Sequence, residues 1–149
     1  MKNNYWKYSG IIPASSKEKE DILKYEMDMF RESCKQLRSG SISQFKQNLL
    51  VESLAIHTRI LIVFFYSNKK NKNDIIVQDL LPKSKDWRKI RPSLTQTLED
   101  AKEKANKQLA HLSLWRLKLV RNNRKGWDHS KIKEDMEKVI EKFEEARKN

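Results

Sequence analysis

The chain has 149 residues, 35% of them charged, and a formal net charge of +12 at neutral pH. Only three glycines, three prolines and one cysteine occur, which excludes a disulfide-stapled scaffold and favours long helices joined by few turns. A chain of this length is expected to form one helical domain over residues 1–149, with about two-thirds of its unfolded surface buried.

The cellular compartment follows from what the N-terminal sequence and the cysteine content exclude. The opening residues, MKNNYWKYSGIIPASS, contain no apolar run long enough for a signal peptide. The single cysteine, Cys34, lies in an amphipathic stretch and is expected to be a buried free thiol. These features predict a cytoplasmic protein that does not act on a membrane.

The positive charge is concentrated in two parts of the chain. Residues 67–98 and 99–125 each carry five more basic than acidic groups. A basic surface of this kind attracts RNA or an acidic protein partner. A lysine-rich composition would raise the net charge in the same way without such a partner, and the sequence leaves both interpretations open.

Residues 1–14 contain several aromatic side chains and are predicted to lie as an arm over the bundle. Ser15 and Glu18 then have the spacing of a capping box, which predicts the start of the first helix. Its core face recurs at spacings of three and four, and Ser39 to Ser41 end it. That face consists of Leu23, Met27, Phe30, Cys34 and Leu37.

A second helix is predicted to begin near Ser43 and to contain the most apolar stretch of the chain, Phe45 to Tyr66. Its apolar part is near the lower length limit for crossing a bilayer. Glu52 and the centrally placed Arg59 make insertion unfavourable, by about 2.5–3.5 kcal/mol for the arginine. The segment is therefore predicted to be a helix buried in a protein core.

Polar residues on this helix gather on one side at about 100° per residue. Asn48, Glu52 and Arg59 form a narrow stripe, and we expect Arg59 to pair with a buried carboxylate, either Glu52 or Glu26 of the first helix. The alternatives are that the stripe lines a functional pocket and that Glu26 reaches water. His57 lies among the apolar positions and is expected to be a core histidine with a hydrogen-bond partner.

A long connection over residues 67–92 follows, with a short strand left open at Asp74 to Leu80 and with Trp87 and Ile90 as expected anchors. The third helix is predicted to open at Pro92 with Ser93 as its N-cap. The last helix follows Trp127, with Asp128 or Ser130 as cap, and its core face is Ile132, Met136, Val139, Ile140 and Phe143. These elements predict an all-α fold, a four-to-five-helix bundle.

No motif of high chemical specificity accompanies this fold. One cysteine and three scattered histidines do not make a zinc site, and Glu52 and His57 point about 140° apart on a helix, so they do not form a Glu-x-x-His metal pair. No G-x-S-x-G stretch supports a serine triad. Neither a metal nor another cofactor is expected.

Two runs carry a resemblance, ESLAIHTR in the second helix and ANKQLAHL in the third. The run ANKQLAHL resembles the Arg-Asn-x-x-x-Ala-His stretch of many HEPN domains, all-helical bundles of bacterial defence and toxin systems. With ESLAIHTR, DIIVQDLL and Trp127, most of residues 45–145 also resembles a broad group of bacterial helical proteins that brings no known activity with it.

HEPN ribonucleases act on RNA without a metal, through an Arg-x4–6-His motif at a dimer interface. The resemblance places His111 at the histidine, whereas Lys104, Ala105 and Asn106 occupy the possible arginine positions. It implies a homodimer and, if catalysis is retained, His111 acting with Lys104 or Asn106. A histidine can serve as general acid or base near neutrality. The alternative is that His111 lies at the edge of the core and pairs with Glu52 or a backbone carbonyl.

Three hypotheses follow for the function. The first is a non-catalytic or degenerate HEPN-like bundle of a defence or toxin–antitoxin system that binds RNA or a partner protein. The second is a metal-independent ribonuclease toxin, and the third is a plain interaction module whose charge is compositional. Candidate nucleic-acid-binding residues surround the end of the third helix: Lys107, Trp115, Arg116, Arg121, Arg124 and Lys125.

Overall fold

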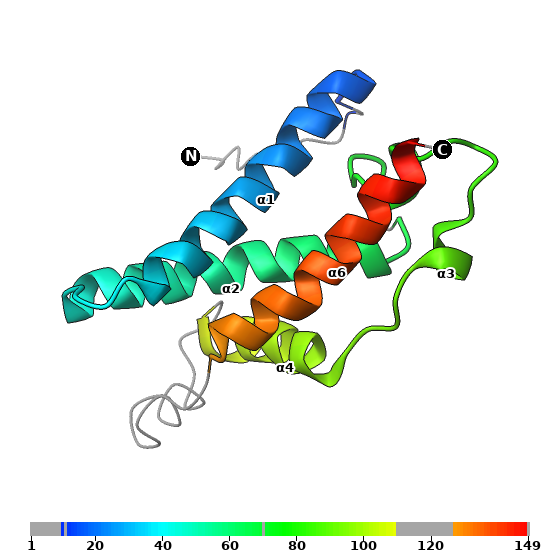
Figure 1. The fold of residues 1–149 in the computed structure, drawn as a ribbon. Helices are drawn as coiled ribbons and strands as arrows, with labels where there is room; N and C mark the ends of the chain where they lie inside the picture. Colours follow the sequence, from blue (N-terminus) through cyan, green and yellow to red (C-terminus); the bar gives the residue numbers. More distant parts are fainter. Residues whose placement is uncertain (1–9, 11, 70, 110–126, 149) are drawn as a thin grey trace, which may run out of the picture.

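The structure is a computed structural model that describes residues 10, 12–69, 71–109 and 127–148, and all regular elements among them are helical. The predicted all-α bundle is therefore confirmed (Figure 1). In chain order the elements are α1 (Ser16–Arg38), α2 (Gln44–Tyr66), the 3-10 turn η1 (Val77–Asp79), α3 (Trp87–Ile90), α4 (Gln96–Lys104), the π-helical turn η2 (Ala105–Leu109) and α6 (His129–Lys148).

The two long N-terminal helices begin where the sequence predicts. The Ser15 hydroxyl accepts from the Glu18 amide, the Glu18 carboxylate accepts from the Ser15 amide, and the two form the expected capping box. Ser43 caps α2 by accepting a hydrogen bond from the Lys46 amide. Local cap chemistry thus sets the starts of both helices.

The start of α4 differs from the prediction. Thr95, not Ser93, is the N-cap, because its hydroxyl accepts from the Leu98 amide and also donates to the Asp135 carboxylate of α6 at 2.8 Å. This tertiary contact, which the local sequence does not reveal, favours Thr95 over Ser93 as the cap. Asp128 accepts a hydrogen bond from the Lys131 amide at the start of α6, as expected.

Helix α2 lies at the centre of the fold and contacts α1, α4, η2 and α6 (Figure 1). The predicted core faces of α1 and α6 both pack into one cluster with it. Phe64 and Phe65 of α2 contact the Phe143 ring of α6 edge to face, at centroid distances of 5.8 and 5.5 Å.

The connection between α2 and α4 is held to this core at one aromatic residue. Trp87 is buried, and its indole Nε1 donates to the Phe65 carbonyl at the end of α2 over 2.7 Å. The stretch Asp74 to Leu80, for which the sequence leaves a strand open, contains the 3-10 turn η1 and no strand, and Val77 of this turn is also buried. The predicted anchor at Trp87 is confirmed.

The segment before α1 is tied to the loop after α2 by one side chain. Asn73 accepts a hydrogen bond from the Ile12 amide at 2.8 Å and donates to the Gly10 carbonyl at 3.0 Å. The remainder of the predicted arm lies outside the described residues. Its described end therefore reaches the loop of residues 67–74.

Candidate functional site

The two sides of α2 differ in what they contact. Its buried side includes Leu54, His57, Leu61 and Phe65, as predicted. The other side carries large apolar residues open to solvent, among them Phe45, which is 72% exposed. We call these five residues the α2 face: Phe45, Leu49, Ile56, Ile60 and Val63.

The α2 face is one continuous stripe. At about 100° per residue its five members fall within about 60° of one another around the helix axis. Single exposed apolar side chains are ordinary, whereas a contiguous apolar patch marks a surface on which something binds. Among the described helices, α2 is long and apolar enough to cross a membrane. The core helix of a soluble protein meets the same criteria of length and composition.

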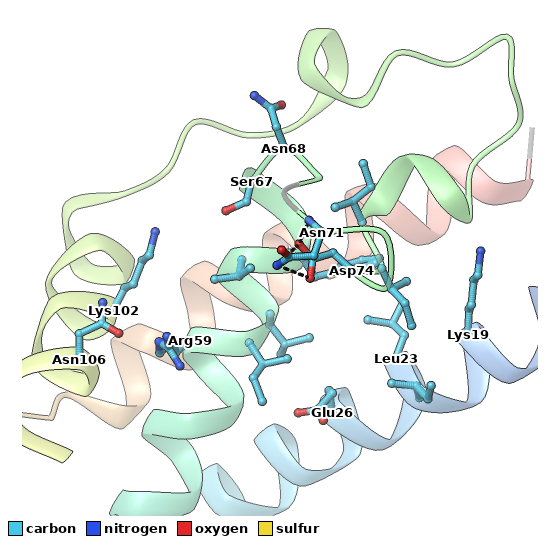
Figure 2. Close-up of a pocket in the computed structure, with 17 residues that line it drawn as sticks. Lys19, Leu23, Glu26, Arg59, Ser67, Asn68, Asn71, Asp74, Lys102 and Asn106 are labelled. Carbon is cyan, nitrogen blue, oxygen red and sulfur yellow. Dashed lines mark hydrogen bonds between the residues drawn. The ribbon is translucent and has the colours of Figure 1, made fainter. Parts of the chain in front are cut away.

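A groove of about 530 Å³ opens beside the C-terminal half of this face. It lies between α1, α2, the loop of residues 67–76 and the end of α4 with η2 (Figure 2). Its floor is apolar and includes Ile60 and Val63 of the α2 face together with Ile22, Leu23, Ile75 and Ile76. The groove therefore extends the exposed apolar surface sideways from α2.

Cationic side chains border the groove from three elements. Lys19 comes from α1, Arg59 from α2 and Lys102 from α4, and Figure 2 shows Arg59 beside Lys102 and Asn106 on one side with Lys19 on the other. None of the three cations has an ion-pair partner among the residues that the structure describes. The border thus carries these three cations against two carboxylates, Glu26 and Asp74, over an apolar floor.

The groove's acidic residue on α1 already has a partner. Glu26 Oε2 lies 2.6 Å from His57 Nδ1, and both side chains are largely buried. The expectation that His57 is a core histidine with a hydrogen-bond partner is confirmed. One oxygen of the Glu26 carboxylate is occupied by this hydrogen bond. Glu26 therefore offsets less of the positive charge of Lys19, Arg59 and Lys102 than a free carboxylate at this position would.

The predicted buried ion pair of Arg59 is wrong. Arg59 is exposed at the edge of the groove, and Glu26 pairs with His57 instead. The reason is that α2 is covered on the α1 and α4 sides but not between them, so the polar stripe faces solvent. Glu52 and Asn48 are exposed as well, and the described contact of Asn48 is a hydrogen bond from Gln44 within α2.

The catalytic candidates fall partly outside the described residues. Asn106 lies in η2 and lines the groove, whereas Lys104 ends α4 and does not border it. His111 lies outside the described part of the chain. Asn106 is thus brought beside Arg59, which sequence reasoning did not pair with it. A π-helical turn of this kind often occurs at functional sites.

Of the nucleic-acid-binding candidates, Lys107 is described, exposed and paired with Glu103. The others, Trp115, Arg116, Arg121, Arg124 and Lys125, lie outside the described residues. A different basic hollow of about 350 Å³ adjoins α3. We call it the α3 hollow, and its charged lining consists of Lys83, Lys85, Arg88 and Arg91 with the acidic Asp86.

Within the described part of the chain, no group of three or more His, Cys, Asp or Glu side chains is placed to hold a metal ion. The feature that sequence reasoning missed is the α2 face. Its signal was present, because Phe45, Leu49, Ile56, Ile60 and Val63 recur at spacings of four, seven, four and three. Comparison with protein-family models, curated proteins and solved structures gave no significant match.

Proposed function

We propose that this chain is a non-catalytic, HEPN-like binding protein of a bacterial defence or toxin–antitoxin type system, and that it docks a protein partner on the α2 face and the adjoining groove. The observation that supports this proposal is the continuous exposed stripe of five large apolar residues on the central helix. Burying such a stripe contributes about 25 cal/mol per Å² of apolar surface.

The shape of the surface suits an amphipathic helix. Helix-in-groove recognition uses anchors at helical spacing that enter an apolar groove, and the α2 face offers both such a stripe and such a groove. The border adds a preference for acidic chemistry, because Lys19, Arg59 and Lys102 surround the apolar floor. A partner with apolar anchors flanked by carboxylates fits this arrangement.

Site-specific photo-crosslinking in living bacteria tests the proposal. A benzophenone amino acid in place of Ile60, or of Ile56, should give protein adducts identifiable by mass spectrometry. The matched control is position 141, which is exposed on α6 and does not line the groove. Absence of adducts from both α2 positions, or equal adducts from the control, would contradict protein docking at this face.

RNA binding is the second candidate, and the α3 hollow favours it. Four basic residues against one acidic residue line that hollow, and Asp86 already pairs with Arg88. Phosphate contacts make affinity fall as salt increases, and four contacts should lower it by on the order of a hundred-fold between 50 and 200 mM salt. A salt series with wild type and Lys83→Glu/Lys85→Glu tests this, and affinity that does not depend on salt would rule it out.

The ribonuclease alternative is tested with the same RNA. Because the family's arginine is absent, we expect no cleavage at micromolar protein by wild type or by His111→Ala. Cleavage by wild type that is lost in His111→Ala would replace the binding proposal with a metal-independent ribonuclease.

A further inference from the structure

The α3 hollow carries a larger excess of positive charge than the groove. Its lining has four cations, Lys83, Lys85, Arg88 and Arg91, and one carboxylate, Asp86, which gives a net charge of +3. Among the described residues, Asp86 pairs with Arg88 at 3.2 Å, and neither lysine has a carboxylate partner. An anion is therefore the kind of ligand that would balance the charge of this lining.

The loop that carries the two lysines is held in place by hydrogen bonds. The Lys85 amide donates to the Pro82 carbonyl at 2.9 Å, which closes a turn around Lys83. The Gln78 side chain of η1 donates to the Lys85 carbonyl at 2.6 Å and accepts from the Trp87 amide at 3.4 Å. Because these bonds order the backbone before a ligand arrives, less conformational entropy is lost when one binds.

Arg91 is held in place at the end of α2. Its Nη1 donates to the Phe65 carbonyl at 3.2 Å, and its guanidinium lies 5.0 Å from the centre of the Tyr66 ring. One such hydrogen bond leaves the other N–H donors of the guanidinium available, and a guanidinium fork suits two oxygens of one phosphate group. The hollow thus combines a positioned arginine with two lysines on an ordered loop.

The size and the floor of the hollow favour a small ligand over a polymer. Its volume, about 350 Å³, lies within the range of about 300–1,000 Å³ that is typical of small-molecule sites. Sites for single-stranded nucleic acid instead follow a groove over several nucleotides and stack bases on aromatic side chains. The aromatic residues in the lining, Phe65 and Trp87, are buried and offer no such platform.

We infer that the α3 hollow binds a small phosphomonoester, such as a mononucleotide, with Lys83, Lys85 and Arg91 holding its phosphate. Near neutrality a phosphomonoester carries a charge of about −1.5 to −2, whereas each phosphodiester of an RNA backbone carries one negative charge. The phosphomonoester therefore matches the net charge of the lining more closely. This site goes beyond the proposed docking at the α2 face and does not depend on it.

Calorimetric titration of the purified full chain with adenosine 5′-monophosphate (AMP) tests the charge requirement. We expect saturable binding of AMP, and affinity lower by about ten-fold or more for its methyl ester, which has lost one phosphate charge. Adenosine should bind more weakly still. Equal affinity for AMP and its methyl ester would overturn the inference. Failure of both AMP and phenyl phosphate to bind at millimolar concentration would overturn it as well.

Lysine substitutions test where the phosphate lies. Lys83→Met and Lys85→Met should each weaken AMP binding by about ten-fold, because a charge-assisted hydrogen bond to the phosphate is lost. Lys89→Met is the matched control, since Lys89 is an exposed residue of α3 that does not line the hollow. It removes the same charge and should keep the wild-type affinity to within about two-fold. Equal losses in all three variants would show that net charge alone attracts AMP and would overturn the site.

The outcomes separate this inference from RNA binding and from protein docking. An RNA oligonucleotide without terminal phosphates that binds more tightly than AMP, and no longer binds to Lys83→Glu/Lys85→Glu, would overturn the phosphomonoester and support RNA at this hollow. Docking is tested separately by the crosslinks from positions 56 and 60, because the α2 face shares no residue with the lining of the hollow.

Discussion

His57 of α2 and Glu26 of α1 are joined by a 2.6 Å contact between Nδ1 and Oε2, at the edge of the groove. The contact fixes the position of α1, which forms one wall of the groove, relative to α2. Breaking a hydrogen bond to a charged group that is largely buried costs about 1.5–3 kcal/mol. We predict that His57→Ala and Glu26→Ala each lower the free energy of unfolding in urea by about this amount.

The pair also predicts how the two substitutions combine. Because both remove the same contact, the double variant should cost at least about 0.5 kcal/mol less than the sum of the single variants. Arg59→Met serves as the control, since the exposed Arg59 has no partner within the described residues and its loss should change stability by less than about 0.5 kcal/mol. Additive single effects at Glu26 and His57 would contradict the coupling.

Asp135 gives a prediction for acid stability. Its burial acts to raise the pKa of the carboxyl, but hydrogen bonds from Thr95 and Lys131 outweigh it, so the pKa lies below its ordinary value. A carboxyl with a lowered pKa in the folded state stabilises the fold above its ordinary pKa, and this contribution is lost as pH falls below about 4. Urea unfolding of wild type should therefore show stability falling through that range.

Asp135→Asn should flatten this part of the profile and lower stability at pH 7 by about 1–3 kcal/mol. The loss includes weaker support for Thr95, which caps α4. Glu141→Gln, an exposed position on the same helix, is the matched control. An unchanged acid profile in Asp135→Asn would show that another carboxyl governs it.

Trp87 holds the connection to the end of α2 through ring packing and one hydrogen bond to the Phe65 carbonyl. We predict a loss of about 3–5 kcal/mol for Trp87→Ala, because a large cavity forms. Trp87→Phe keeps most of the packing and should cost about 1–3 kcal/mol. Denaturant unfolding measures both, and equal losses would mean that the hydrogen bond dominates.

Cys34 is predicted to be inert while the protein is folded. Burial raises the pKa of its thiol to about 11, so little thiolate exists near neutrality. Alkylation by iodoacetamide at pH 8 should be slower in the folded protein than in urea by on the order of a hundred-fold. Similar rates in the two states, followed by mass spectrometry, would show that α1 opens locally.

Thr58 offers a stabilising substitution. Its hydroxyl oxygen is buried and has no hydrogen-bond partner in the described part of the chain. Thr58→Val removes that unmet polar group at nearly the same shape and should leave stability unchanged or raise it by about 1 kcal/mol. A clear loss of stability in thermal unfolding would reveal a partner for the hydroxyl.

The sequence anticipates most of this fold where local rules operate. Ser15 and Ser43 cap their helices because side chain and amide are neighbours in the chain, and the apolar period of α6 places Phe143 in the core. Ser93 and Thr95 are both local cap candidates, and the contact that favours Thr95 is with Asp135, forty residues away. Long-range contacts of this kind leave no local signal.

The candidate site was less predictable for a related reason. An apolar helix was expected to be covered on all sides, so a charged residue such as Arg59 required a buried partner. The helices cover only part of α2, and its remaining apolar residues, Ile56 and Ile60 among them, are exposed. Periodicity shows which residues share a side of a helix but not whether a neighbour lies there.

The two hydrogen bonds of Asn73 have a mechanical consequence. They fasten the segment before α1, at Gly10 and Ile12, to the loop whose next residue, Asp74, lines the groove. A displacement of that segment is transmitted to the groove wall through the Asn73 side chain and not through α1. A molecule that binds the chain ahead of α1 therefore changes the shape of the groove directly.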